Sequence, residues 1–96
     1  MTAARFEWDP DKNVKNQEKH GESFYDAQFA FADPNRVIAD DNAHRDAEQR
    51  YFCFGELNGG IVTVRFTYRV GAIRTYGAGY CRKGKIIYER ENKIQY

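Results

Sequence analysis

Residues 50–79, RYFCFGELNGGIVTVRFTYRVGAIRTYGAG, decide the fold, because apolar and polar side chains alternate along most of this stretch. The alternation predicts three strands, over residues 50–57, 61–69 and 72–79. Turn-forming residues separate them, since Asn58-Gly59-Gly60 follows the first strand and Val70-Gly71 follows the second. We therefore expect these strands to form an antiparallel meander.

The two turns set the register of the meander. A two-residue turn at Val70-Gly71 places Arg69 opposite Ala72 and Arg65 opposite Tyr76. For the other turn we expect a three-residue loop, with its last glycine in a left-handed conformation. The alternative, a two-residue turn, would invert the first strand and place its phenylalanines among the arginines.

This register divides the meander into two unlike faces. The apolar face is expected to carry Phe52, Phe54, Val62, Val64, Phe66, Tyr68 and Ile73. The polar face is expected to carry Tyr51, Cys53, Thr63, Arg65, Thr67, Arg69, Arg74 and Tyr76. We expect a helix to cover the apolar face.

The first third of the chain predicts two helices. Asp9-Pro10 is a typical helix start, because the aspartate oxygen caps free N–H groups and proline suits the first helical position. This polar helix should end at Gly21. Ser23 then caps a second helix, which carries aromatic side chains on one stripe and stops at Asp33-Pro34. Further elements are expected at residues 5–8 (a short edge strand), 36–40 (a strand) and 82–96 (a helix).

Length and composition limit the class of protein. A chain of 96 residues, 42% of them hydrophobic, can bury one modest core, so we expect a single domain over residues 1–96. The expected fold is α+β. It has an antiparallel four-stranded sheet, five-stranded if residues 5–8 join it, two N-terminal helices packed on one face, and a C-terminal helix.

The sequence also predicts where the protein works. No apolar run approaches the roughly 20 residues of a transmembrane helix, and the first residues lack the apolar region of a signal peptide. We therefore expect a cytoplasmic protein with no membrane partner.

Charge is distributed unevenly along the chain. Residues 1–60 carry seven Lys or Arg against twelve Asp or Glu, a net charge of −5, whereas residues 61–96 carry eight against two, a net charge of +6. The basic and aromatic side chains expected to share one surface are Tyr51, Arg65, Arg69, Arg74, Tyr76, Arg82, Lys83 and Lys85. Guanidinium groups pair with phosphates and aromatic rings stack on bases, so this pattern is typical of a single-stranded nucleic-acid site. Ordinary solvated charges on a sheet face are the alternative.

Ribonuclease chemistry needs a base for the 2′-hydroxyl, charge stabilisation at phosphorus and an acid for the leaving oxygen. Arginine, lysine and tyrosine can cover these tasks without a histidine pair. The general base stays open among Glu48, Tyr51, Tyr76 and His20. We expect no metal and no cofactor, because His20 and His44 are isolated and Cys53 and Cys81 lack C-x-x-C spacing.

A series of motifs runs in order along nearly the whole chain. They are Phe6-Glu7-Trp8-Asp9-Pro10, Lys19-His20-Gly21, Ser23-Phe24, Phe31-Ala32-Asp33-Pro34, Glu48-Gln49-Arg50-Tyr51, Tyr68-Arg69, Ile73-Arg74, Arg82-Lys83-Gly84-Lys85 and Tyr88-Glu89. Together they resemble the BrnT family of bacterial toxins, the DUF497 proteins. The resemblance implies a RelE-like fold, a ribonuclease that arrests translation, and neutralisation by a BrnA-like antitoxin of ribbon-helix-helix type.

The resemblance also implies an assembly. It implies that the toxin and its antitoxin form a complex that represses its own operon. In this complex the antitoxin covers the basic face of the toxin, and DNA is contacted by the antitoxin alone. The oligomeric state stays open between a toxin homodimer and a heterotetramer with the antitoxin.

The resemblance and the charge pattern lead to a hypothesis of a metal-independent endoribonuclease that cleaves mRNA. Its catalytic residues would be Arg65, Arg74 and Arg82 on phosphate, Tyr76 and Tyr80 for stacking or proton transfer, and Lys83 at the leaving group. Tyr51, Arg69 and Lys85 would bind RNA. The alternative is a non-catalytic binding module that keeps the fold and serves only as an antitoxin partner or a regulator.

The chain departs from the family pattern after its last strand. Many members carry a Ser-Ala-Arg-Lys-like run there, whereas this chain has Gly77-Ala78-Gly79-Tyr80 and lacks the arginine that would stand at Gly79. The pattern is similar to that of another branch, Gly-Ala-Gly-Tyr-x-Arg-Lys-Gly. Arg82, Lys83 or Tyr80 would then have to replace the missing arginine.

Overall fold

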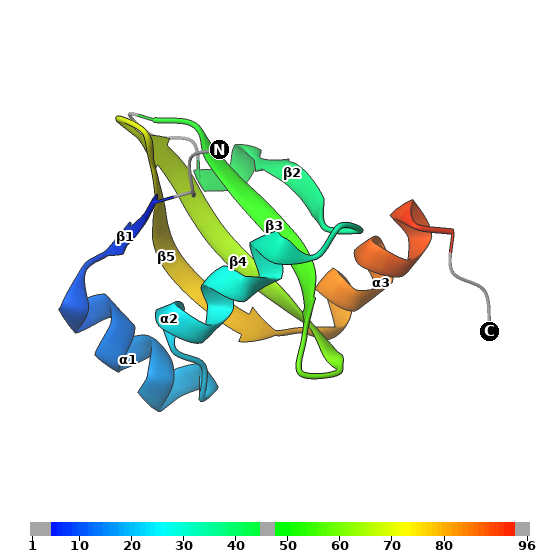
Figure 1. Ribbon diagram of the computed structural model, residues 1–96, viewed down its shortest axis with the longest axis horizontal. Helices are drawn as coiled ribbons and strands as arrows, with labels where there is room; N and C mark the ends of the chain where they lie inside the picture. Colours follow the sequence, from blue (N-terminus) through cyan, green and yellow to red (C-terminus); the bar gives the residue numbers. More distant parts are fainter. Residues whose placement is uncertain (1–4, 45–47, 94–96) are drawn as a thin grey trace.

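The computed structural model describes residues 5–44 and 48–93. These residues form an α+β fold around a five-stranded mixed sheet in the order β1-β5-β4-β3-β2 (Figure 1). The strands are β1 (Arg5–Trp8), β2 (Val37–Asp41), β3 (Arg50–Leu57), β4 (Gly60–Arg69) and β5 (Ala72–Tyr80). The helices are α1 (Pro10–His20), α2 (Phe24–Ala27) and α3 (Arg82–Glu91), with 3₁₀ helices η1 (Gln28–Ala32) and η2 (Asn42–His44). The expected antiparallel sheet is wrong at one edge, where β1 runs parallel to β5.

Helix α1 lies beside the edge of β5. Its ends are those the sequence predicts, since the Asp9 carboxylate accepts a hydrogen bond from the Asp11 N–H at 2.8 Å and Gly21 ends the helix at φ 69°. The side-chain amide of Asn16 donates to the carbonyl of Ala78 at 2.8 Å and accepts from its N–H at 3.2 Å. Strand N–H and C=O groups point along the plane of the sheet. We expected both N-terminal helices on one face, but α1 occupies the strand edge beyond β1.

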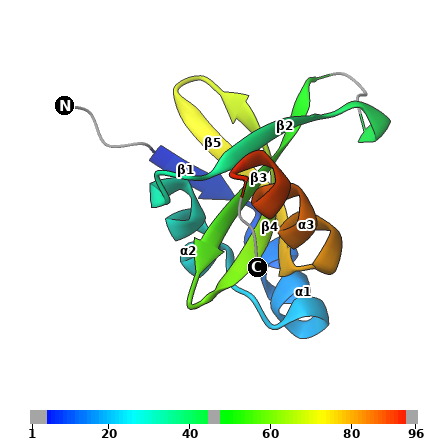
Figure 2. The same ribbon diagram turned by 90° about the vertical axis from the view of Figure 1, so that its right-hand side faces the viewer.

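Helix α2 and η1 cover one face of the sheet, and α3 lies on the other side (Figure 2). Ser23 caps α2 as predicted, by accepting from the Asp26 N–H at 3.0 Å. The core beneath consists of Phe24, Ala27, Ala30, Cys53, Val62, Val64, Phe66 and Ala78. Gly55 makes the close approach of η1 possible, because a Cβ there would lie 2.9 Å from the Ala30 Cβ and closer still to the Ala30 carbonyl oxygen.

The β3–β4 hairpin has a two-residue turn, so the expected three-residue loop was wrong. Leu57 pairs with Gly60. The turn residues Asn58 and Gly59 have φ values of 53° and 83°, as a type I′ turn requires. This turn matches the right-handed twist of the two strands, which favours it over the longer loop.

The shorter turn inverts β3 relative to the expected register. Phe52 opposes Arg65 and Phe54 opposes Thr63, so both phenylalanines lie on the face away from α2. Tyr51 packs on the opposite face, where its ring stacks on Phe66 at 5.4 Å between centroids. The expected positions of Phe52, Phe54, Tyr51 and Cys53 were therefore exchanged between the two faces.

Strand β5 contains a bulge at Tyr76. From the Val70-Gly71 turn the pairing follows the prediction as far as Phe66 opposite Thr75, but Arg65 then opposes Gly77. The expected pairing of Arg65 with Tyr76 was thus wrong by one residue. A bulge leaves its extra residue without a partner and turns its side chain away from the regular direction.

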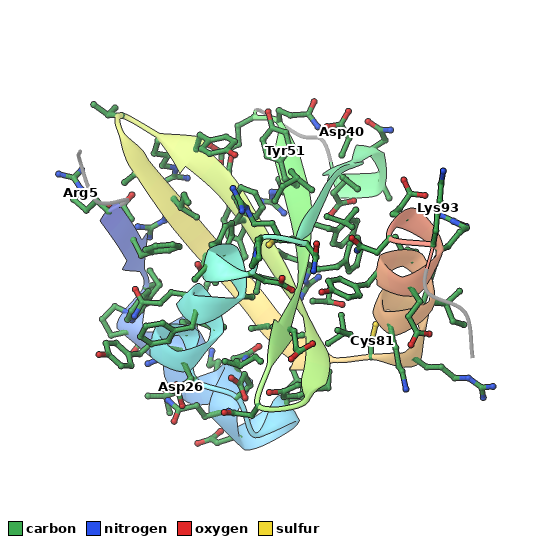
Figure 3. The ribbon with its side chains drawn as sticks, turned by 45° about the vertical axis from the view of Figure 1, so that its right-hand side comes forward. Arg5, Asp26, Asp40, Tyr51, Cys81 and Lys93 are labelled. Atoms are coloured by element: carbon green, nitrogen blue, oxygen red, sulfur yellow. The ribbon has the colours of Figure 1, made fainter. Side chains whose placement is uncertain are left out.

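Helix α3 packs on the face that carries Phe54 and Thr63. The Sγ of Cys81 caps it by accepting from the Gly84 N–H at 3.2 Å, and Figure 3 shows Cys81 where β5 passes into the helix. Gly84 allows the helix to approach, because a Cβ there would lie 3.0 Å from the Phe54 ring and closer to the Thr63 hydroxyl. The predicted helix extended to residue 96, whereas the described helix ends at Glu91 and residues 94–96 lie outside the described residues.

Asp33 connects α3 to the sheet. Its carboxylate accepts hydrogen bonds from the Asn35 N–H at 2.8 Å, the Glu56 N–H at 2.8 Å and the Tyr88 hydroxyl at 2.7 Å. Burial alone would raise the pKa of Asp33, but these hydrogen bonds lower it overall. Burial, and then the bond to Asp33, raises the pKa of Tyr88 to about 12. One carboxylate thereby fixes the position of α3.

Tyr88→Phe is expected to lower the free energy of unfolding by about 1 to 3 kcal/mol at neutral pH, because it removes a hydrogen bond to an ionised carboxylate. The difference in free energy of unfolding between the variant and wild type should become smaller below about pH 4, because Asp33 takes up a proton in the unfolded chain at a higher pH than in the folded chain. It should also narrow above about pH 10, where the phenol ionises first in the unfolded chain. Urea unfolding of both proteins at several pH values measures this difference. If it stayed constant down to about pH 3, the stability would not depend on the protonation of Asp33, and the prediction would be wrong.

Candidate functional site

The sheet face opposite α2 and η1 carries a cluster of arginines around one tyrosine. We call this cluster the basic face. It consists of Arg50, Arg65, Arg69, Arg74 and Tyr76, with Glu48 at its margin. Helix α3 covers the β3–β4 end of the same side of the sheet, and α1 stands along the β5 edge, so the basic face has two walls.

Arg65 is the most available cation of the basic face. Its guanidinium lies against Gly77, where a Cβ would come within 2.7 Å of Nη2. Arg65 is exposed and has no carboxylate partner among residues 5–44 and 48–93. Glycine at position 77 therefore makes room for a guanidinium that is free to bind an anion.

Beside Arg65 lies a hollow between α1 and β5. Its volume is about 190 Å³, and its lining consists of Lys12, Lys15, Asn16, Lys19, His20, Arg65 and Tyr76. The three lysines are exposed and have no carboxylate partner in the described part of the chain. The hollow is thus surrounded by uncompensated positive charge and is suited to phosphate.

Tyr76, Glu48 and Arg69 form one hydrogen-bonded group. The Tyr76 hydroxyl donates a short hydrogen bond to Oε1 of Glu48. Arg69 binds the same carboxylate with two nitrogens, Nη2 at 3.0 Å and Nε at 3.4 Å. These bonds hold the phenol and the guanidinium in fixed positions on the face.

The same bonds set the protonation states of the group. The hydrogen bonds from Arg69 and then Tyr76 lower the pKa of Glu48. Burial, and then the hydrogen bond to Glu48, raises the pKa of Tyr76. At neutral pH the group therefore contains an ionised carboxylate, which accepts protons, and a neutral phenol, which donates one.

Two more cations contact the Tyr76 ring. The Arg50 guanidinium lies 4.5 Å from the ring centroid and the Lys12 ammonium lies 5.4 Å from it. Nε of Arg50 is buried and has no hydrogen-bond partner among the described residues. Arg50 thus holds Tyr76 in place and retains an unused donor.

Arg50 and the lysines of α1 are site residues that were not predicted from the sequence. Lys12, Lys15 and Lys19 follow the i, i+3, i+7 spacing of one helix face, a signal that was available in the sequence. Only the position of α1 beside β5 shows that this stripe adjoins Arg65. Arg50 was assigned to no role because the expected register did not place it next to Tyr76.

Several predicted site residues lie elsewhere. Tyr51 is on the face covered by α2, and Tyr80 is held away from the basic face by a hydrogen bond from its hydroxyl to the Leu57 carbonyl at 3.0 Å. Arg74 lies on the basic face but pairs with Glu7 at 3.7 Å. The structure therefore brings together Arg65, Arg69 and Tyr76, while Arg74 is partly neutralised.

The basic residues at the start of α3 point to two different surfaces. Arg82 and Lys85 line a shallow hollow with Gly60, Ile61 and Tyr80, away from the basic face. Lys83 lines a groove that contains Phe52. Next to Gly79 lies the His20 ring, whose Nδ1 would be 3.4 Å from a Cβ at that position. Apart from the two chain neighbours of Gly79, the nearest side chain is thus His20, and not Arg82 or Lys83.

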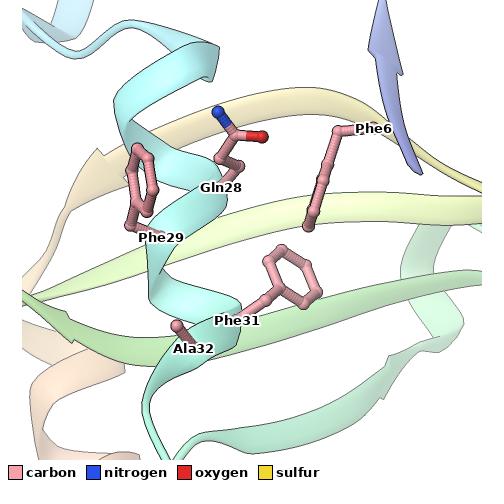
Figure 4. A pocket seen from close by; sticks show the side chains of 5 residues that line it. All are labelled: Phe6, Gln28, Phe29, Phe31 and Ala32. Atoms are coloured by element: carbon pink, nitrogen blue, oxygen red, sulfur yellow. The ribbon is translucent and has the colours of Figure 1, made fainter. Parts of the chain in front are cut away.

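A separate apolar groove lies on the other side of the molecule (Figure 4). Phe6, Gln28, Phe29, Phe31 and Ala32 line it, between η1 and β1. The Phe29 ring is half exposed and meets the Tyr25 ring edge to face at 5.8 Å. This groove shares no residue with the basic face.

Residues 5–44 and 48–93 contain neither a metal-ligand cluster nor a membrane-spanning helix. No three His, Cys, Asp or Glu side chains there converge as metal ligands. No helix in the same residues has the length and apolar character to cross a bilayer. Cys53 is buried, which raises the pKa of its thiol to about 12, so it is held as a neutral core residue.

Comparison with known proteins gave one family. The model of a family described as "Ribonuclease toxin, BrnT, of type II toxin-antitoxin system" matches residues 8–84, which is more than half of the chain. No curated protein was found to match the sequence. The matched residues include all of the basic face and the whole of α1.

Proposed function

The chain belongs to the BrnT family of ribonuclease toxins of type II toxin–antitoxin systems, and we propose that it uses the basic face to cleave mRNA and thereby inhibits translation. The observation that carries this proposal is the pairing of an uncompensated cation with a proton-handling group on one face. Arg65 has no acidic partner in the described residues, and the Tyr76–Glu48–Arg69 group adjoins it.

We propose a division of tasks that needs no metal ion. Arg65 stabilises the charge that develops on the phosphate during attack by the 2′-hydroxyl. The ionised Glu48 carboxylate accepts the proton of that hydroxyl, and Tyr76 stays positioned as a donor. His20, at the far wall of the same hollow, is the candidate acid for the leaving oxygen.

A type II toxin has a protein antitoxin, and we propose one of BrnA-like ribbon-helix-helix type that covers the basic face. An acidic or helical segment laid over Arg65 and the α1 lysines would neutralise their charge and block access of RNA. In this arrangement the toxin contacts DNA only through the antitoxin.

Expression of the wild-type chain without an antitoxin tests the function. Growth arrest and cut transcripts are expected, with cut positions mapped by sequencing the new 5′ ends. Co-expression of the short neighbouring reading frame, if it has the ribbon-helix-helix pattern, should restore growth. Normal growth with intact transcripts would contradict the ribonuclease proposal and favour a non-catalytic partner of the antitoxin.

Replacing all three α1 lysines with glutamine is expected to weaken the binding of single-stranded RNA. It should also make the dissociation constant less dependent on salt concentration. Each lost phosphate contact should reduce the slope of log Kd against log salt by about 0.7, so the triple variant should lose about 2. Fluorescence anisotropy with an RNA blocked at its 2′-hydroxyls gives the slope. Arg36→Gln with Arg90→Gln and Lys93→Gln is the matched control, because it removes the same charge at a site distant from the hollow.

A further inference from the structure

A groove lies between α3 and the sheet, next to the basic face. Its volume is about 270 Å³. Ala39, Phe52, Phe54 and Ile87 provide its apolar lining, and Asp40, Thr63, Cys81 and Lys83 provide its polar lining. The groove contains none of the residues to which the proposed cleavage chemistry has been assigned.

The floor of the groove is a pair of stacked aromatic rings. The rings of Phe52 and Phe54 have centroids 5.7 Å apart and an interplanar angle of 24°. Phe54 is buried beneath α3, whereas Phe52 is only half buried. Phe52 therefore offers ring surface to a further flat group placed in the groove.

Both ends of the groove wall are fixed. At the start of α3, Gly84 packs against Phe54, and the Cys81 Sγ lies 3.6 Å from the Thr63 hydroxyl. Toward its end, Tyr88 binds Asp33, and the Asn92 side chain donates to the Asn35 carbonyl at 2.9 Å. The groove is thus preformed, and a ligand would not have to displace the helix.

The groove is continuous with the phosphate-binding part of the basic face. Phe52 is directly opposite Arg65 across the β3–β4 pairing, where neighbouring Cβ atoms are about 5 Å apart. Any nucleotide whose phosphate binds Arg65 therefore has its base, or that of its neighbour, within reach of the groove. The apolar lining excludes the phosphate itself.

We propose that this groove holds a nucleobase of the RNA, stacked on Phe52, and that it gives cleavage a base preference. Lys83 is a donor without a carboxylate partner in the described residues, and Asp40 is an acceptor in the same lining. Together they suit guanine, which presents two acceptors, O6 and N7, and an amino donor. This inference rests on the proposed ribonuclease function for its consequence at the cut site. The binding of the base does not depend on cleavage.

The first test measures base binding alone. Short RNAs blocked at their 2′-hydroxyls and carrying one 2-aminopurine are titrated with wild type, Phe52→Leu, Phe52→Tyr and Phe29→Leu. We expect wild type to quench the fluorophore at one position. Phe52→Leu should bind about tenfold more weakly and lose the quenching, whereas Phe52→Tyr should keep both. Phe29→Leu, in the apolar groove on the other side, is the matched control and should behave as wild type.

The second test reads the cut sites. Wild type should favour one base beside the cut, and Phe52→Leu and the exposed Lys83→Gln should each reduce this preference to about twofold or less. If Phe52→Leu does not melt cooperatively, and is therefore not properly folded, Lys83→Gln still tests the base preference. Wild-type quenching and preference in folded Phe52→Leu would overturn the inference while leaving the ribonuclease proposal intact. If Phe52→Leu lost only antitoxin binding, the groove would be a protein-docking site, and the inference would also be wrong.

Failure of the ribonuclease proposal has a different signature. An uncut RNA with position-specific quenching that depends on Phe52 would remove the proposed catalysis and leave the base pocket in place. An RNA that neither quenches nor is cut would overturn both.

Discussion

Arg65→Ala is expected to lower kcat for RNA cleavage by about 10²- to 10³-fold with little change in thermal stability. The guanidinium lies against Gly77, beside the fixed Tyr76–Glu48–Arg69 group, so its removal leaves the developing phosphate charge without its nearest uncompensated cation. Single-turnover cleavage of a short RNA measures the effect. An increase in KM alone, with kcat unchanged, would assign Arg65 to RNA binding and contradict its role in charge stabilisation.

Two comparison variants sharpen this measurement. Arg65→Lys keeps the charge but loses the forked donor geometry, so it should recover only part of the rate. Arg90→Ala removes an exposed arginine that pairs with Glu91 on α3, far from the basic face, and should leave cleavage unchanged. Equal losses in Arg65→Ala and Arg90→Ala would mean that general charge, and not the position of Arg65, controls the rate.

Gly55→Ala is expected to lower the free energy of unfolding by about 3 kcal/mol, the largest stability effect we expect from a single added methyl group. The new Cβ would lie 2.9 Å from the Ala30 Cβ and closer still to the Ala30 carbonyl oxygen, so the backbone of η1 has to move. A domain of this size has a total stability of about 5 to 10 kcal/mol, so the loss is a large share. Urea unfolding at neutral pH measures it.

Gly79→Ala is the matched control for this substitution. It adds the same methyl group to a strand glycine, but the nearest atoms, in the His20 ring, lie 3.4 Å away. The change in stability should stay within about 1 kcal/mol. If the two variants were equally stable, η1 would be free to move away from β3, and the packing explanation would fail.

The local signals in the sequence predicted the helices of the N-terminal half well. Asp9-Pro10, Gly21 and Ser23 act through their own backbone neighbours, so their effect does not depend on the rest of the fold. The strands were also predicted nearly to the residue, because alternation is a local property. The position of α1 beside the β5 edge depends instead on distant contacts, such as those between Asn16 and Ala78 and between Lys12 and Tyr76.

The register of β3 shows why a reasonable argument failed. We preferred a three-residue loop because it kept Phe52 and Phe54 away from the arginines. The structure buries Phe54 by placing α3 over that end of the face and leaves Phe52 beside it, so one face is basic in one part and apolar in another. A rule that assigns one character to each face of a sheet cannot anticipate a helix that begins only at Arg82.

The candidate site was predictable only in part for the same reason. Arg65 and Arg69 follow from the β4–β5 turn, whose two-residue length was predicted correctly, whereas a bulge moves Tyr76 out of the expected pairing with Arg65. Tyr51 and Tyr80 were assigned to the basic face and lie elsewhere, one because β3 is inverted and the other because its hydroxyl binds Leu57. The lysines of α1 could not be assigned to the site, because the sequence pattern predicts the helix but does not show that it lies beside β5.

The Asn16 amide has a consequence for how this sheet meets other chains. A free strand edge invites an extended segment of another protein to pair with it, and this is a common route to both partner binding and aggregation. On β5, β1 takes up the first part of the edge and Asn16 takes the backbone groups of Ala78 farther along. Among the described strands β2, Val37–Asp41, is at the opposite end of the sheet order. The Ala78 backbone groups on β5 are therefore closed to an added strand, and the two terminal strands of the sheet order are β1 and β2.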